Sequence, residues 1–221
     1  KLSLFGIYTI GDLARFDLDI LKRHLGKMGE IIYWFANGYD QSEVAYIDTC
    51  EEVKSVGNGI TTPKDMNHLR EAQSVFYVLC ESVASRAKEI GMAGRCISIQ
   101  LRDTDLKSFT RQKTLSRATN LSDEMMIVVM ELLRKNYDFS KPLRSVSVSL
   151  SHLQLENEKV QLSLFEDEIH LQKQYHLEKT IDQIRLRYGF KSIKRCSMLL
   201  DKELSDFDPK NDHIIFPVGY F

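Results

Sequence analysis

The hydrophobic positions of the central hundred residues fall into short alternating segments. Residues 96–102 and 144–151 alternate between apolar and polar side chains, which is typical of half-buried strands. Residues 53–61 are interpreted as a further strand, and residues 106–115 return from the turn at 103–105 as a hairpin partner. These four segments predict a single sheet.

Two longer segments follow the helical period. Thr62 and Pro63 predict a helix start, because proline at the first helical position sacrifices no hydrogen bond, and apolar residues then recur at helical spacing up to Gly91. Ser122 is expected to cap a second helix whose apolar stripe extends to Leu133. Each helix therefore has one side to bury against the sheet.

The order strand, helix, strand, strand, helix, strand predicts an α+β domain over residues 53–154. We expect a four-stranded antiparallel sheet with both helices on one face. The other, open face would carry small hydroxyls, Gln100 and basic side chains, a composition that lets a phosphodiester backbone approach main-chain amides. This composition predicts a DNA-facing sheet.

The segments on either side of this domain have different patterns. Residues 1–48 predict short helices broken at glycines, which would form a small helical subdomain, and the polar residues 41–52 are the best candidate for a linker. Residues 155–221 are expected to form a loosely structured tail with a short amphipathic helix at 177–188.

Charge is segregated along the chain although the net charge is only −1. Residues 95–117 hold six Lys or Arg against two Asp, whereas residues 156–168 hold five acidic residues against one Lys, so different partners are expected for the two stretches. The four cysteines form no CxxC pair and the histidines have no zinc-binding spacing, which predicts a reduced, cytoplasmic protein without a metal site. No apolar run reaches the length of a membrane span, so no membrane partner is expected.

A short glycine pattern lies between two predicted helices at residues 25–29, which read LGKMG. Gly26 and Gly29 would let the amides of a helix N-terminus approach a phosphate, and Lys27 adds a positive charge. This is the pattern of a helix-hairpin-helix turn, although a plain helix–helix turn explains so short a pattern equally well.

Basic side chains alternate along the predicted third strand at Lys107, Arg111 and Lys113. Their neighbours Thr110 and Thr114 and the hydroxyl-rich partner strand favour phosphate binding. The alternative is a solvated charged strand.

Asp103 and Asp105 are paired carboxylates, which two-metal phosphoryl-transfer enzymes use to hold magnesium. A hairpin turn also favours aspartate for backbone hydrogen bonding, and no third carboxylate stands on a neighbouring strand. We therefore predict no catalytic residue and no metal ligand in this chain, with a small nuclease using these two residues as an alternative.

The most specific signal is the pentapeptide QLSLF, formed by Gln161, Leu162, Ser163, Leu164 and Phe165. It is an apolar cluster inside an acidic tail without a neighbouring helix or strand, so its exposure predicts a partner pocket. Packing of these residues on the folded domain is the alternative.

All five positions of QLSLF match the motif by which bacterial DNA polymerases and repair proteins bind the sliding clamp, with Gln161, Leu164 and Phe165 as anchors. The tail therefore resembles a clamp-docking peptide. Residues 54–65 (KSVGNGITTPKD) resemble the entry into the little-finger domain of UmuC- and DinB-like polymerases, which adds Lys54, Ser55, Gly57 and Asn58 to the expected DNA contacts.

Four further segments resemble the same Y-family polymerases. Residues 104–116 and 144–154 are similar to two little-finger strands, residues 25–40 to the second hairpin of the thumb, and residues 181–189 loosely to tails of Gram-positive ImpB/MucB/SamB-type members. The resemblance implies the C-terminal part of a translesion DNA polymerase acting in DNA repair and damage tolerance.

In this interpretation residues 1–48 are a thumb remnant, residues 53–154 the little finger, and residues 155–221 a tail with the clamp-binding motif. The implied partners are primer–template DNA and the sliding clamp. The palm and fingers have no counterpart in the sequence, so no cofactor is expected in this chain, whereas the parent polymerase implies magnesium. The main alternative is a repair or scaffold protein of non-polymerase origin that links DNA to the clamp.

Overall fold

The computed structural model describes residues 1–42, 44, 52–156, 168–199 and 201–209. Contacts divide the chain between residues 51 and 52 into two units, which are described separately. Across the described residues, no helix has the length and apolar character needed to cross a membrane.

The first unit consists of η1 (Leu2–Phe5), α1 (Ile10–Arg15), α2 (Leu18–Leu25) and α3 (Lys27–Ala36). Two side chains cap its helices: the Thr9 hydroxyl accepts from the Asp12 amide at 3.1 Å, and the Asp17 carboxylate accepts from the Ile20 amide at 2.9 Å. Gly26 is both the C-cap of α2 and the N-cap of α3, so α3 follows α2 directly.

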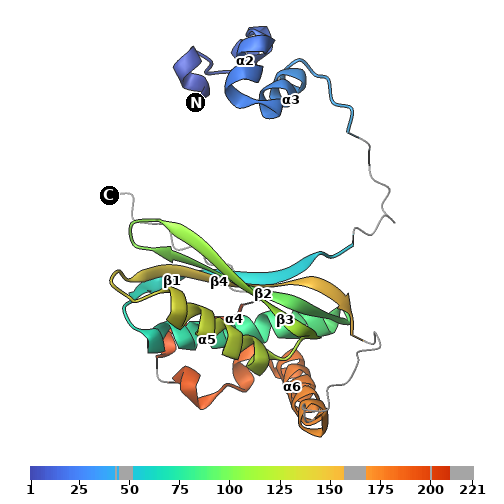
Figure 1. The fold of residues 1–221 in the computed structure, drawn as a ribbon, viewed down its shortest axis with the longest axis vertical. Coiled ribbons are helices and arrows are strands. Elements are labelled where there is room, and N and C mark those ends of the chain that lie inside the picture. Colours follow the sequence, from blue (N-terminus) through green and yellow to red (C-terminus); the bar gives the residue numbers. More distant parts are fainter. Residues whose placement is uncertain (43, 45–51, 157–167, 200, 210–221) are drawn as a thin grey trace. The chain divides into compact units, whose positions relative to one another are not determined.

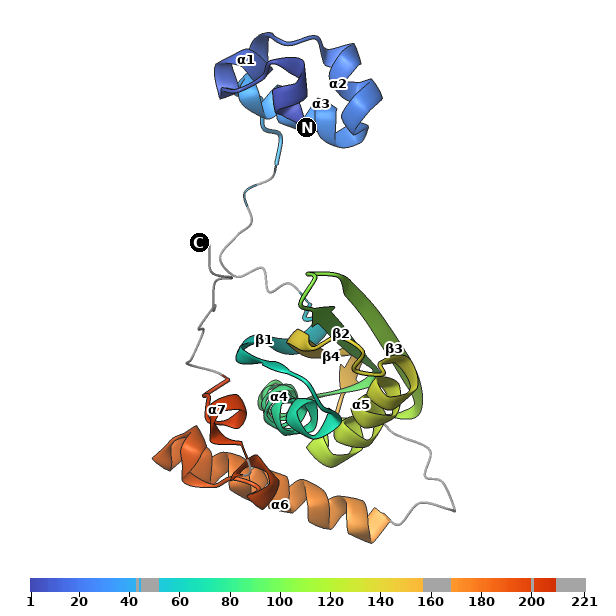
Figure 2. The same ribbon diagram turned by 90° about the vertical axis from the view of Figure 1, so that its left-hand side faces the viewer.

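The second unit has the predicted element order. Its elements are β1 (Ser55–Met66), α4 (Leu69–Glu89), β2 (Met92–Asp103), β3 (Ser108–Thr119), α5 (Ser122–Asn136) and β4 (Leu143–Leu155). The strands form an antiparallel sheet in the order β1-β4-β2-β3, and α4 and α5 cover one face of it (Figures 1 and 2). The predicted α+β fold is confirmed.

The helix start predicted at Thr62 and Pro63 is wrong, because β1 continues to Met66 and α4 begins at Leu69. Strand β1 is an edge strand, and its pairing with β4 is irregular between Thr61 and Met66. A proline is tolerated at such a position, since no neighbouring strand needs its missing amide proton. The helix begins instead where the Glu71 carboxylate accepts from the His68 amide at 3.2 Å.

Residues 168–209 are more ordered than the tail composition indicates. They form α6 (Glu168–Tyr188), η2 (Phe190–Ser192), η3 (Cys196–Leu199) and α7 (Lys202–Ser205). The helix predicted at 177–188 is confirmed as the second half of α6. Leu204 is fully buried in the main core and Lys64 of β1 pairs with Asp201 at 2.8 Å, so this part of the tail packs on the sheet-and-helix unit.

Candidate nucleic-acid interface

Helices α4 and α5 cover one face of the sheet, and the opposite face is here called the open face (Figure 1). Directly opposed residues of antiparallel strands point to the same side, so Gln100 lies beside Thr110 and Ser147. The next residues along β2, Ile99 and Leu101, point to the helices and are fully buried. By this register the open face consists of small and polar residues together with the buried Cys96: Ser55, Gly57, Gly59 and Thr61 of β1, Ser145, Ser147, Ser149 and Ser151 of β4, Cys96, Ser98, Gln100 and Arg102 of β2, and Ser108, Thr110, Gln112 and Thr114 of β3.

The two glycines of β1 leave main chain uncovered on this face. A Cβ added at Gly59 would lie 2.5 Å from Cβ of Ser147, and one added at Gly57 would lie 3.0 Å from Cβ of Ser149. The close approach of β1 and β4 therefore requires glycine at position 59. A polyanionic backbone can come near these amides without meeting a bulky side chain.

The predicted cations of β3 lie at the strand's edge on the helix side. Arg111 is opposite Ile99 and Lys113 is opposite Ile97, so both point toward α5. The Arg111 Nε donates to Asn136 Oδ1 at 3.1 Å, and Lys113 Nζ lies 2.5 Å from a carboxylate oxygen of Glu131. The open face thus receives Thr110 and Thr114 from this strand but not the two basic side chains that the sequence interpretation assigned to it.

The alternating set of β3 that holds Arg111 and Lys113 also holds Phe109 and Leu115, and both of these apolar side chains pack against the core. Lys107 precedes β3 in the turn, where its amide donates to Asp103 Oδ1 at 2.9 Å. The sequence interpretation predicted the positive charge of β3, but it missed that Phe109 and Leu115 place the set of Arg111 and Lys113 on the helix side.

The residues expected at the entry into this domain are divided between the two faces. Lys54 and Ser55 are exposed at the start of β1, and Gly57 lies on the open face. Asn58 points to the helix side, where its Nδ2 donates to Ser82 Oγ at 3.1 Å and to the carbonyl oxygen of Pro209 at 2.9 Å. Asn58 therefore connects β1 with α4 and with the end of the described chain.

The glycine pattern of the first unit has two separable roles. Gly26 has φ of 64° and, with Lys27, is exposed at the N-terminus of α3, where helix amides suit an anion. Gly29 is buried, and a Cβ there would lie 2.4 Å from the carbonyl oxygen of Leu21. Packing of α3 on α2 accounts for Gly29, which leaves Gly26 and Lys27 at the surface that a phosphate could reach.

The turn carboxylates have structural partners. Asp105 pairs with Lys141, and the hydrogen bond from Lys141 lowers the pKa of the Asp105 carboxyl below its usual value. Asp103 accepts the Lys107 amide. Within the part of the chain that the structure describes, no group of three or more His, Cys, Asp or Glu residues is arranged to hold a metal ion.

A buried ionic network joins α6 to the helices that support the sheet, and the sequence interpretation did not predict it. The Glu178 carboxylate of α6 accepts from the Ser122 amide at 2.9 Å and from the Ser122 hydroxyl at 2.7 Å. Lys88 Nζ of α4 lies 2.7 Å from the other oxygen of Glu178, and both side chains are about nine-tenths buried. The prediction that Ser122 caps this helix is wrong, because α5 begins at Ser122 itself. The cap position is held by Leu121, which has no polar side chain, and the Glu178 carboxylate accepts the Ser122 amide instead.

The network continues through Glu81 of α4. Its carboxylate lies 2.7 Å from Arg185 of α6 and 2.6 Å from Arg195, and Arg195 reaches Asp123 of α5 at 2.8 Å. Desolvation raises the pKa of Asp182, whose carboxylate lies 3.8 Å from Lys88. These partners are far apart in the sequence, so no local sequence pattern predicts their pairing.

The predicted clamp-binding residues 161–165 lie outside the described residues, which resume at 168. The flanks of this segment are described: β4 ends at Leu155 and α6 begins at Glu168, both in the second unit.

Comparison with known proteins agrees with this fold. Residues 53–164 match the model of the impB/mucB/samB family C-terminal domain. The chain is 36% identical over 205 residues to DNA polymerase IV of Acetivibrio thermocellus, covering 93% of this chain and 51% of that protein. It is 38% identical over 201 residues to DNA polymerase IV of Pelotomaculum thermopropionicum, covering 90% and 48%, and 34% identical over 203 residues to DNA polymerase IV 2 of Bacillus subtilis, covering 90% and 48%.

A four-stranded antiparallel sheet with two helices on one face and an open polar face is the architecture of a little-finger domain. Since the family model matches half of its residues, the chain belongs to the impB/mucB/samB family of Y-family DNA polymerases and contains that family's C-terminal domain. The chain spans about half the length of the curated relatives that it matches.

Proposed function

We propose that this chain is the DNA-binding and clamp-docking part of a translesion DNA polymerase. The open face is the observation that carries the proposal: the helices of its own unit leave it uncovered, and it is lined by hydroxyls, amides and glycine main chain. Such a surface suits phosphate and sugar contacts, which position a protein on DNA without reading its sequence. A polymerase that copies damaged templates needs this kind of grip.

The proposed DNA contacts fall into three groups. The open face supplies Gly57, Thr110, Thr114 and Arg102, with Lys54 and Ser55 at its entry. Lys107, Arg111 and Lys113 would reach phosphates along the β3 edge beside that face. Gly26 and Lys27 would bind a phosphate at the N-terminus of α3, with Gly29 keeping α3 close to α2.

Salt-dependent binding to primer–template DNA tests this assignment. Four to six phosphate contacts predict a log–log salt slope of roughly −4 to −5, and each cation removed from the interface should bring the slope about 0.9 closer to zero. Arg102→Gln and Arg111→Gln should each do so. The exposed Lys173 on α6 provides the matched control, and Lys173→Gln should leave the slope unchanged. Equal effects of all three changes, or a strong preference for one DNA sequence, would contradict the proposed surface.

The second proposed activity is docking onto the sliding clamp through Gln161, Leu162, Ser163, Leu164 and Phe165. Leu164 and Phe165 would enter an apolar pocket, and Gln161 would form hydrogen bonds at its rim. Burying the two apolar side chains contributes roughly 1.5–3 kcal/mol each before ordering costs, which is compatible with micromolar affinity. Because clamp and polymerase would share one DNA, tethering turns this weak contact into a high effective concentration at the primer end.

Calorimetric titration with the clamp tests the docking motif. The double change Leu164→Ala, Phe165→Ala should abolish clamp binding and leave both the circular dichroism spectrum and the DNA affinity unchanged. Wild-type clamp affinity in this variant would show that the motif is not the docking element.

The parent protein is proposed to act in the bacterial cytoplasm and to use magnesium, because DNA polymerases generally require a divalent metal. A scaffold that only joins DNA to the clamp is the competing function. Family membership and relatives named DNA polymerase IV favour the polymerase. The nuclease alternative is disfavoured because Asp103 and Asp105 are engaged by a turn amide and by Lys141.

A further inference from the structure

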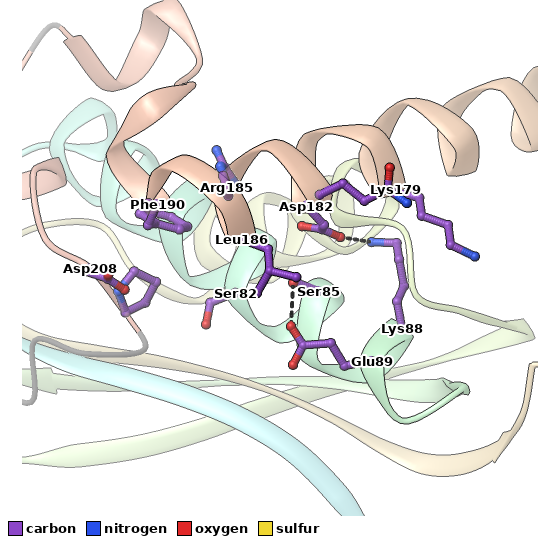
Figure 3. A pocket seen from close by; sticks show the side chains of 13 residues that line it. Ser82, Ser85, Lys88, Glu89, Lys179, Asp182, Arg185, Leu186, Phe190 and Asp208 are labelled. Carbon is purple, nitrogen blue, oxygen red and sulfur yellow. Dashed lines mark hydrogen bonds and ion pairs between the residues drawn. The ribbon is translucent and has the colours of Figure 1, made fainter.

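A groove of about 390 Å³ lies between α4 and α6, on the helix side of the second unit (Figure 3). Ser82 and Ser85 of α4 face Leu186 of α6 across it, Phe190 and Asp208 lie at one end, and Pro209 also lines it. Its size falls in the range of sites that receive a ligand or a few side chains.

The charged groups around this groove already have partners. Lys88 pairs with Glu178 and Asp182, and Arg185 pairs with Glu81. The apolar side chains are less well covered: Leu186 is 87% exposed, and Phe190 is half-buried beneath the Arg185 guanidinium at 4.5 Å. An uncovered apolar side chain beside satisfied ion pairs suits an apolar occupant rather than an ion.

The chain itself leads into this groove. Pro209 is buried in its lining, and the carbonyl oxygen of Pro209 accepts from Asn58 Nδ2 at 2.9 Å. This contact fixes the place from which the remaining residues 210–221 continue. Their sequence, KNDHIIFPVGYF, holds an apolar run from Ile214 to Val218. The twelve residues 210–221 can extend about 40 Å, so this segment is long enough for its apolar run to reach α6 from Pro209.

We propose that the groove between α4 and α6 is the docking site of the chain's own C-terminal segment, with side chains of residues 214–218 covering Leu186 and Phe190. The anchor at Pro209 makes the docking intramolecular, and a short tether gives a high effective concentration even for a weak contact. The described chain ends at the groove, which favours this occupant over a partner protein.

Tryptophan fluorescence in the full chain tests the docking. The single tryptophan is removed by Trp34→Phe, and Phe216→Trp places a new reporter in the C-terminal run. We expect a blue-shifted emission and several-fold weaker acrylamide quenching than in a free peptide of residues 210–221 with the same change. Adding Leu186→Asp should restore peptide-like quenching, whereas Ile169→Asp, at a similarly exposed apolar position outside the groove, should not.

Three results would overturn the proposal: peptide-like quenching in the full chain, equal effects of Leu186→Asp and Ile169→Asp, or protection that increases with protein concentration. The last result would assign the groove to the C-terminal segment of a second copy. Hydrogen exchange provides an independent measurement that needs no substitution. Deleting residues 210–221 should increase amide exchange in residues 182–190 and leave residues 169–175 unchanged, and unchanged exchange at 182–190 would also contradict the docking.

Discussion

The strongest energetic prediction concerns Glu178, which joins three helices. Glu178→Ala removes the partner of Lys88, whose side chain is only 7% exposed, and it removes the acceptor for the Ser122 amide at the start of α5. Breaking a buried ion pair from one side costs about 3–5 kcal/mol. Asp182 remains 3.8 Å from Lys88 and compensates in part, so we expect a loss of about 3 kcal/mol of unfolding free energy.

Urea unfolding followed by circular dichroism measures this loss, and Trp34 fluorescence reports separately on the first unit. The Trp34 transition should not move, because Glu178 belongs to the other unit. Replacing both members of the pair, as in Glu178→Leu with Lys88→Met, should recover much of the loss, since no buried charge is then left unpaired. Lys173→Ala on the same helix is the control. A loss below about 1 kcal/mol for Glu178→Ala, the size expected of an exposed pair, would refute the reasoning.

Two further predictions concern stability. Gly29→Ala should destabilise the first unit by about 1–3 kcal/mol, because the added Cβ meets the Leu21 carbonyl, whereas Gly11→Ala meets only ordinary contacts and should be neutral or stabilising; Trp34 fluorescence in urea distinguishes them. Asp182→Asn should stabilise the second unit at neutral pH, because desolvation raises the pKa of Asp182 and its ionised form disfavours the fold. This advantage should shrink as the pH falls through the raised pKa toward about 4, and an advantage that grows in acid would contradict it.

The sequence predicted helices and strands correctly wherever a segment had one clear hydrophobic period, either alternating or helical. The alternation through Ile97, Ile99 and Leu101 and through Val146, Val148 and Leu150 predicted two strands whose inner residues are buried. Pro63 misled the assignment of the first helix, because a proline at a helix start and a proline in an irregular edge strand share the same local sequence.

The basic character of the candidate site was predictable, and the sequence also held a signal for its orientation that the interpretation did not use. Phe109 and Leu115 alternate in the same set as Arg111, so that set faces the core, whereas the β2 residue opposite Arg111 depends on the register, which is a tertiary property. Glu178 could not be found from the sequence because its partners Ser122 and Lys88 are distant in the chain and no motif connects them.

The pairing of β1 with β4 has a consequence for the order in which the protein folds during synthesis. Ser55 pairs with Ser151, so β1 must wait for nearly a hundred further residues before it can join the sheet. The polar cap of α5 arrives later still, with Glu178. At about 5–20 residues per second, the ribosome adds these last elements over several seconds, during which the edge of β1 and the start of α5 lack their partners. The helix layer is thus completed by α6 of the tail. A nascent chain halted near residue 155 would contain all four strands but would lack Glu178, which accepts the first amide of α5.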